Sequence, residues 1–450
     1  MKKGFLCLVA ALWAAGGFLY AAPDSVSWEV DYGLRDSVDR VGNRYIRYDS
    51  PHPSVFTFVN EDGSVTVCAA DDAAKTTHVY EYSAALQERT AFSFANALDW
   101  LGAFTKDAEG NYYFFYGRRS SGRDDGNMAM VKRGREGEEL LVFKLKANTP
   151  KSMDGIRIPF DAGTCRLELS GSLLAVYFAR EMFSGHQASY GFVLDKDTFE
   201  RVDLGAATHP RMGDITQMPY VSHSFNQFIV PFEGGFLFAD HGDAYPRCFT
   251  FAKFQKGSRT KRLDAFKFPG QTGQNATYAE MGGLAKTQGG YIFAGAYGRT
   301  AGAPRNLFIL TFDEALSACT APVYLTEYTK EDGHVGHPKI TALDGGRYLL
   351  LWERYAFSTQ PANRIGQGTT EYLSTYMRVI DGEGNALSDV EELPGVRLNM
   401  NDVPRYNRRN GNVYWAINEG GSSVTRDRSS VSVTYGSPSI TLYALDPGAP

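Results

Sequence analysis

A short turn containing glycine, followed at once by an aromatic or aliphatic run, recurs seven times along this chain of 450 residues. Successive turns lie 47 to 65 residues apart and centre on Gly63, Gly110, Gly171, Gly235, Gly290, Gly346 and Gly411. Tight hairpin turns need positive φ, which glycine adopts at little cost. Self-similarity at such a period predicts an array of similar units, each built from strands.

The third repeat illustrates the expected unit. Its four expected strands are Arg166–Leu169, Leu173–Ala179, Gly191–Leu194 and Phe199–Leu204. Residues 170–172 form the turn between the first two. The first alternates polar and apolar residues, as a half-buried strand does. We expect a four-stranded antiparallel meander here and in most other repeats. Two β-sandwiches in tandem are the alternative fold.

The seventh repeat is incomplete at its end. It contains Val413–Ala416 and Ile440–Leu445, and the chain then stops without a further strand. The segment Val26–Val30 precedes the first full repeat and has no partner of its own. We therefore predict that it completes the last unit and closes the array into a ring, which removes exposed sheet edges.

On these repeats the chain resembles β-propeller repeat proteins of the bacterial secreted type. The resemblance is architectural and implies an all-β fold, a seven-bladed β-propeller of four-stranded antiparallel blades closed by the N-terminal strand. The Gly-Gly pairs at 234–235, 289–290 and 345–346 faintly resemble kelch turns, but the kelch Tyr and Trp are absent at their fixed offsets. No named repeat family is matched, and a count of six or eight blades stays open because the first step is short.

The N-terminus reads as an export signal. Met1–Lys3 is basic, and Gly4–Ala22 is apolar and ends in small residues. This pattern predicts a signal peptide over residues 1–21 and a single propeller domain over residues 22–450. An uncleaved anchor is the alternative, since 19 residues can barely span a bilayer. We expect export to the periplasm or the medium, with no stable membrane insertion after cleavage.

Charge and cysteine usage exclude several classes of protein. The formal net charge is −5 at pH 7, which argues against nucleic acid as a partner. Beyond the signal, Cys68, Cys165, Cys248 and Cys319 fit no zinc pattern. We expect them to be small core residues, although their even number allows a disulfide.

We expect the protein to be a monomer.

The long connections predict which side of the propeller is used. In a meander blade, the loops between second and third strands share one side with the links between blades. We call this side the long-loop face; it comprises residues 146–165, 180–190, 205–223, 240–246, 269–280, 329–337, 355–370 and 417–435. Functional residues gather on loops held by a rigid scaffold. Six of the eight histidines fall here: His186, His209, His223, His241, His334 and His337.

Polar side chains on or beside these loops are the candidate ligand-binding residues: Arg180, Glu181, His186, His223, Asp240, His241, Asp243, Arg247, Arg299, His337, Glu353 and Arg354. The densest group is the segment 240–247. It also fits a hydrogen-bonded turn in which Arg247 pairs with an aspartate. His223 and His337 stand just before inner strands, where a histidine often bonds its own turn.

Two functions from different classes fit this pattern. The first is a binding or scaffolding module for a protein or a glycan, since aromatic residues and arginines suit that role. The alternative is a carbohydrate-active enzyme. A glycoside hydrolase would draw two carboxylates from Glu181, Asp240, Asp243, Glu353 and Glu419. A polysaccharide lyase would pair a histidine base with an arginine.

A divalent metal at His223, His241 and His337 is a further option. None of these groups has the spacing of a motif, so we assign no catalytic residue. A serine nucleophile is not expected, because the sequence contains no Gly-x-Ser-x-Gly elbow.

Overall fold

The computed structural model describes residues 22–32, 55–71, 73–149, 154–160, 163–202, 206–209, 213–216, 221–255, 258, 260–274, 277–300, 302–357, 371–399, 402–419, 423–426, 431–434 and 439–448. The predicted signal peptide, residues 1–21, lies outside these ranges. Within them, no helix has the length and apolar character needed to cross a membrane.

The first two repeats form separate four-stranded antiparallel sheets, as predicted. The first sheet consists of β2 (Val55–Val59), β3 (Val65–Asp71), β4 (Thr76–Tyr82) and β5 (Glu88–Ala95). The second consists of β6 (Trp100–Lys106), β7 (Tyr112–Gly117), β8 (Gly126–Arg133) and β9 (Glu139–Lys146).

The third and fourth repeats join into one eight-stranded sheet, through Ala188 opposite Ser222. The third contributes β10 (Ile158–Pro159), β11 (Cys165–Ser170), β12 (Leu173–Glu181) and β13 (Gln187–Asp195). The fourth contributes β16 (Ser222–Phe232), β17 (Gly235–Ala244), β18 (Cys248–Gln255) and β19 (Lys261–Lys267).

The strand predicted over Phe199–Leu204 does not form in the described residues. A single bridge joins Leu194 to Arg201 there. The buried Phe199 has a φ of 58°, which interrupts extended backbone, and its ring lies 6.3 Å from that of Tyr113. The edge of this unit is therefore a turn anchored in the core.

The last three repeats again form four-stranded sheets. The fifth contains β20 (Ala279–Lys286), β21 (Gly290–Tyr297), β22 (Asn306–Asp313) and β23 (Val323–Tyr324). The sixth contains β24 (His334–Ala342), β25 (Tyr348–Tyr355), β26 (Tyr372–Ile380) and β27 (Glu391–Leu393). The seventh contains β28 (Arg405–Tyr406), β29 (Val413–Glu419), β32 (Ser439–Leu445) and β1 (Asp24–Glu29). Two small hairpins stand apart, β14 (Ala206–His209) with β15 (Gly213–Thr216) and β30 (Ser423–Arg426) with β31 (Val431–Thr434).

The N-terminal strand joins the last sheet, as the sequence predicted. β1 pairs with β32 antiparallel, from Asp24 opposite Ala444 to Glu29 opposite Ser439. Trp28 also packs against the first sheet, with ring centroids 5.2 Å from Tyr80 and 5.1 Å from Tyr82. The segment that contains β1 therefore contacts both the last sheet and the first.

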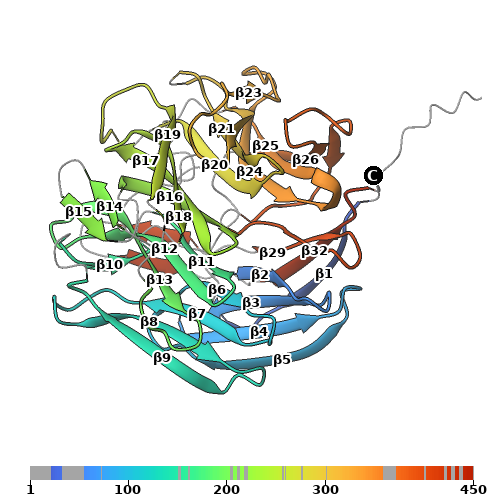
Figure 1. Ribbon diagram of the computed structural model, residues 1–450. Helices are drawn as coiled ribbons and strands as arrows, with labels where there is room; N and C mark the ends of the chain where they lie inside the picture. Colours follow the sequence, from blue (N-terminus) through green and yellow to red (C-terminus); the bar gives the residue numbers. More distant parts are fainter. Residues whose placement is uncertain are drawn as a thin grey trace, which may run out of the picture.

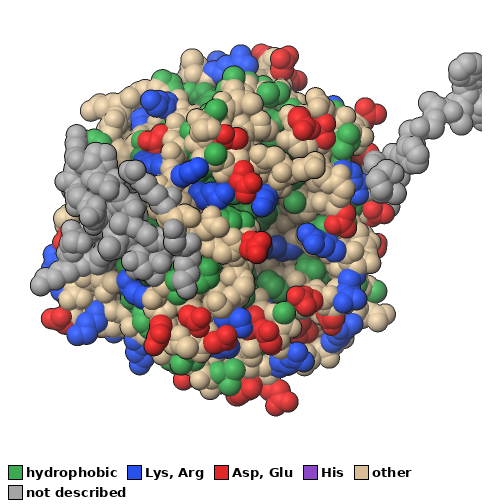
Figure 2. Space-filling view, in the orientation of Figure 1, with side chains coloured by type: hydrophobic (Ala, Val, Ile, Leu, Met, Phe, Trp, Pro, Cys, Tyr) green, Lys and Arg blue, Asp and Glu red, His purple; other side chains and the backbone are tan. Residues whose placement is uncertain are grey.

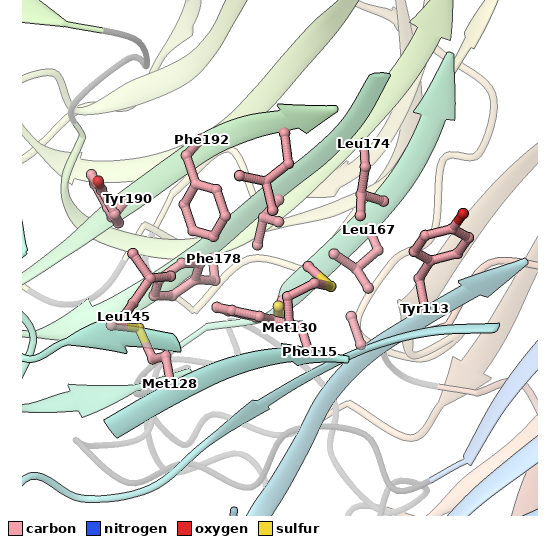
Figure 3. Close-up of a cluster of buried hydrophobic side chains, with 14 of the residues drawn as sticks. Tyr113, Phe115, Met128, Met130, Leu145, Leu167, Leu174, Phe178, Tyr190 and Phe192 are labelled. Atoms are coloured by element: carbon pink, nitrogen blue, oxygen red, sulfur yellow. The ribbon is translucent and has the colours of Figure 1, made fainter. Parts of the chain in front are cut away.

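Neighbouring sheets pack face to face through separate apolar cores. Figure 3 shows the core between the second and third repeats, where Phe115 meets Phe178 and Phe192. Their ring centroids lie 5.5 and 5.8 Å apart, in the tilted and edge-on arrangements that aromatic pairs favour. Figure 1 shows the sheets standing around a common centre, which is the arrangement of a β-propeller. Tandem sandwiches would instead pair the sheets two by two.

The repeated glycines are explained in two ways. Five have positive φ, as the turn argument predicted: Gly63, Gly110, Gly171, Gly346 and Gly411. At the other two positions the reason is close approach of the backbone. A Cβ on Gly235 would lie 2.2 Å from the carbonyl oxygen of Phe254, and one on Gly290 would lie 2.1 Å from that of Phe312. In the fourth repeat, Gly234 has the positive φ.

The cysteine prediction is confirmed at three positions and wrong at one. Cys68, Cys165 and Cys248 are buried, whereas Cys319 is exposed, and none of the four is in a disulfide. Cys319 lies in the connection between β22 and β23, held to β22 by an isolated bridge to Phe312. Its side chain therefore never enters a space between two sheets.

Candidate functional site

Most of the candidate residues lie in strands, which corrects their assignment to loops. β12 includes Arg180 and Glu181, β17 includes 240–243, and β24 includes His337. The apolar runs end earlier than the strands, but the hydrogen-bonded ladder continues through polar residues. Asp240, for example, still pairs with Thr250 on one side and Gln227 on the other.

Asp240 lies inside the protein between the third and fourth repeats. Its carboxylate accepts hydrogen bonds from the hydroxyls of Tyr177, at 2.6 Å, and Ser224, at 2.7 Å. The side chain has no exposed area, and burial raises the pKa of Asp240 to about 7. This carboxyl is a buried link between two repeats of the joined sheet.

His241 is a neutral core residue. Its Nε2 lies 2.7 Å from the hydroxyl oxygen of Thr277, and its ring meets those of Phe225 and Phe249 edge-on at 5.1 and 5.0 Å. Burial lowers the pKa of His241 to about 3, with a smaller contribution from Arg247. The imidazole therefore stays uncharged over the physiological range.

Asp243 organises the corner after β17. Arg247 forms an ion pair with it, which confirms the turn interpretation drawn from the sequence, and donates from Nε and Nη2 to the carbonyl of Pro269 at 3.1 Å. His223 Nδ1 lies 3.7 Å from Asp243 Oδ2. Tyr245 stands between the paired residues with 54% of its surface exposed.

The histidines His186 and His223 are brought together beside this corner. Their ring centroids are 5.1 Å apart, and His186 Nε2 lies 2.7 Å from the hydroxyl oxygen of Ser222. Burial lowers the pKa of His186, and the charges of His223 and Arg180 add to the effect. These residues come from the third and fourth repeats, so the joined sheet creates the pair.

Glu353 is the centre of a second buried network. His337 Nδ1 lies 2.6 Å from Oε2, while Arg397 Nε and the backbone N–H of Leu398 donate to Oε1 at 3.0 and 2.8 Å. The hydroxyl of Tyr355 also donates to this carboxylate. Burial alone would raise the pKa of Glu353, but His337 and Arg397 lower it to about 2. The sequence analysis did not single out Arg397, because no pattern connects residue 397 to residue 353.

His223 and His337 belong to a repeated backbone feature. Positive φ recurs at or just before the inner strand in four consecutive repeats, at Phe160, His223, Tyr278 and His337, with values of 65°, 51°, 59° and 49°. All four side chains are aromatic rings, spaced 55 to 63 residues apart. This spacing was a signal available in the sequence.

Residues at this position contact the preceding repeat. The ring of Phe160 packs edge-on against Phe115 at 5.7 Å, and the backbone N–H of His337 donates to Glu280 Oε1 at 3.2 Å. Phe160 has no group that binds a proton or a metal, so the position itself serves packing between repeats.

Arg180 and Glu181 are also held inside the fold. Arg180 is fully buried, donates to the carbonyl of Gly155 and lies 5.4 Å from the ring of Tyr190. Glu181 pairs with Arg157 at 3.1 Å. Both residues fasten the 154–160 segment to β12.

Cations stacked on aromatic rings lie on the long-loop face or on segments beside it. The separations between cation and ring centroid range from 4.2 to 5.4 Å, in the pairs Arg123–Phe183, Arg299–Tyr324, Lys330–Phe357, Arg354–Tyr376 and Arg397–Tyr372. They come from several repeats. Arg299 and Lys330 are exposed to solvent.

The three histidines considered as metal ligands have separate partners. His241 bonds Thr277, His337 bonds Glu353 and His223 lies beside Asp243. In the part of the chain that the structure describes, no cluster of three or more His, Cys, Asp or Glu residues is suited to hold a metal ion. The side chain of Glu419 lies outside the described residues.

No family model and no curated protein matches this chain. Solved structures that match include the β-propeller domain of the Trilobed protease from Pyrococcus furiosus, at 7% identity, 76% coverage of this chain, 81% of that chain and a TM-score of 0.38. A member of the DUF4221 family from Bacteroides vulgatus matches at 9% identity over 94% of this chain and 96% of that one, with a TM-score of 0.41.

Prolyl oligopeptidase B from Galerina marginata matches at 12% identity and a TM-score of 0.40, over 82% of this chain and 45% of that protein. The chain thus spans less than half of that protein's length. Likenesses at these identities and TM-scores carry no argument about what this chain binds or does.

Proposed function

We propose that this chain is an exported, seven-bladed β-propeller that binds a protein or a glycan through its long-loop face. Seven blades follow if the eight-stranded sheet counts as two units. In support, the inner strands contact one another in the order β2, β6, β11, β16, β20, β24 and β28, and β28 contacts β2 again. The pairing of β1 with β32 then provides the closing seam of a ring.

The observation that carries the binding proposal is the set of stacked cations on and beside the long-loop face. Arginine and aromatic residues are enriched where interfaces gain most of their binding energy. A guanidinium already resting on a ring, as in Arg299 on Tyr324 at 4.4 Å, loses little side-chain entropy when a partner docks. The outer side of the exposed Arg299 guanidinium can then contact a sugar ring or a protein side chain.

Burial of the candidate carboxylates favours binding over hydrolysis. A glycoside hydrolase needs two carboxyl groups that flank the sugar bond. Asp240 and Glu353 have no exposed area and accept hydrogen bonds from their own surroundings. A carbohydrate-active enzyme built on them would require both groups to become accessible to the substrate.

A matched pair of arginine variants tests the binding proposal. Screening the mature protein against a glycan array and against immobilised envelope proteins identifies a ligand, and Arg299→Ser is then compared with Arg89→Ser. Arg89 is also exposed, at 52% of its side chain, but it pairs with Asp62 in the turn between β2 and β3, which is not part of the long-loop face. We expect Arg299→Ser to weaken binding at least about threefold and Arg89→Ser to leave it unchanged. The reverse result would refute the assignment of the long-loop face.

Export is tested separately by the mature N-terminus. We propose cleavage of residues 1–21, release of a monomer into the periplasm or the medium, and no stable membrane association. Cell fractionation followed by mass spectrometry should give a chain that begins at Ala22. A membrane fraction containing the intact Met1 chain would contradict this.

A further inference from the structure

A charged pair connects two inner strands that are not neighbours. Arg405 of β28 donates from Nη1 to Glu168 Oε1 of β11 at 3.2 Å. These strands belong to the last and the third repeats, so the pair extends across the space that the inner strands surround. The Arg405 side chain is 34% exposed and that of Glu168 is 21% exposed, so solvent reaches both. Figure 2 shows a hollow near the middle of the molecule with basic side chains beside it.

A second guanidinium lies in the same space. Arg166 stands two residues before Glu168 on β11, and alternate residues of a strand share a face. Its Nε donates to the carbonyl of Gln227 at 2.8 Å, and its guanidinium lies 4.5 Å from the ring of Phe228. Burial lowers the pKa of Arg166 to about 10, with Arg405 adding to the decrease and Asp402 opposing it. The two cations are therefore close enough to repel.

The local acceptors do not satisfy the two guanidinium groups. Arg166 Nη2 and Arg405 Nε are buried and have no hydrogen-bond partner among the described residues. The nearby carboxylate of Asp402 is already engaged, since its oxygens accept the backbone N–H groups of Thr57 at 2.6 Å and Val403 at 3.0 Å. Buried donors without acceptors are rare in folded proteins, and a bound anion is one partner that would supply the missing acceptors.

We propose that a small ligand carrying a carboxylate or phosphate group binds in the central space, between Arg166 and Arg405. Planar guanidinium groups match the oxygens of such anions in pairs of parallel hydrogen bonds. A bound oxyanion would supply acceptors for Arg166 Nη2 and Arg405 Nε. Glu168 competes with the ligand for Arg405 and so limits its affinity. This site is separate from the long-loop face and does not depend on the function proposed for that face.

Calorimetric titration of the mature protein with inorganic phosphate, citrate and galacturonate at low salt tests the site. We expect saturable binding of at least one probe. Binding of phosphate alone identifies a phosphate ligand, and binding of citrate or galacturonate alone identifies a carboxylate. Absence of saturable binding for all three probes would overturn the proposal.

Variants with opposite expected effects localise the binding. Arg405→Gln should weaken the affinity for the bound probe about tenfold or more, and Glu168→Gln, which removes the competing carboxylate, should strengthen it severalfold. Arg408→Gln is the matched control, because Arg408 is 85% exposed in the turn after β28. The affinity of this variant for the probe should equal that of the natural protein. If Arg405→Gln does not fold by circular dichroism, Glu168→Gln decides alone. An unchanged affinity in Glu168→Gln, or in a folded Arg405→Gln, would refute the site.

Discussion

Replacing Glu353 by glutamine should make a pH-dependent part of the protein's stability disappear. The carboxylate has no exposed area and holds His337, Arg397 and the Leu398 backbone together. Its pKa falls from 4.5 to about 2 in the folded protein, because His337 and Arg397 outweigh the effect of burial. A shift of this size corresponds to about 3 kcal/mol of folding free energy.

The direction of the pH effect follows from the lowered pKa. Because the folded protein holds the charged form, the contribution of Glu353 is present above its unfolded pKa of 4.5 and disappears as the pH falls towards about 2. Urea unfolding of the natural protein and of Glu353→Gln should therefore differ by about 3 kcal/mol at pH 7. The difference should shrink steadily below pH 4.5.

The control is Glu139→Gln, which removes an exposed carboxylate. Glu139 is 53% exposed and lies 3.7 Å from Arg133. Surface ion pairs contribute at most about 1 kcal/mol, so its unfolding free energy should change by less than that. If the difference between the natural protein and Glu353→Gln stays constant from neutral to acidic pH, the charge of Glu353 does not stabilise the fold and the reasoning is wrong.

Three further perturbations test other parts of the structure. Deleting residues 24–32 should lower the melting temperature, because β32 loses its partner strand, and an unchanged value would contradict the closing role of β1. Because burial raises the pKa of Asp240 from 3.8 to about 7, the folded protein holds the protonated form, and its stability should fall as the pH rises through this range. Asp240→Asn should abolish this fall, which urea titrations at several pH values would detect. Gly290→Ala should cost about 1–3 kcal/mol, because its Cβ would lie 2.1 Å from the Phe312 carbonyl oxygen; a silent substitution in thermal unfolding would refute this contact.

The prediction of strands succeeded where the signal was local. Each glycine turn is followed by a strand, from β3 after Gly63 to β29 after Gly411. Alternation of side chains and turn chemistry depend on residues only a few positions apart, so the sequence contains them directly. Strand ends were less predictable: β17 continues through polar Asp240 and Asp243 because its neighbours supply the ladder.

The candidate site was only partly predictable for the same reason. Sequence reasoning found that Arg247 pairs with an aspartate of segment 240–247, because the partners are near in sequence, and the structure shows that this aspartate is Asp243. It did not find that Arg397 completes the network of Glu353, since nothing local connects them. The histidines drew attention by their number, but two of them occupy a position that Phe160 and Tyr278 fill in other repeats.

The amino-acid order alone determined that this chain is a series of hairpins and that its first strand completes its last sheet. Those features rest on turn residues, on side-chain alternation and on one unpaired segment at each end. Only the tertiary structure decided which polar groups are buried and which meet in the centre. Arg405 and Glu168 lie 237 residues apart, and their meeting depends on how all the sheets between them pack. Contacts of that kind arise from the accumulated geometry of many sheets, which no short stretch of sequence encodes.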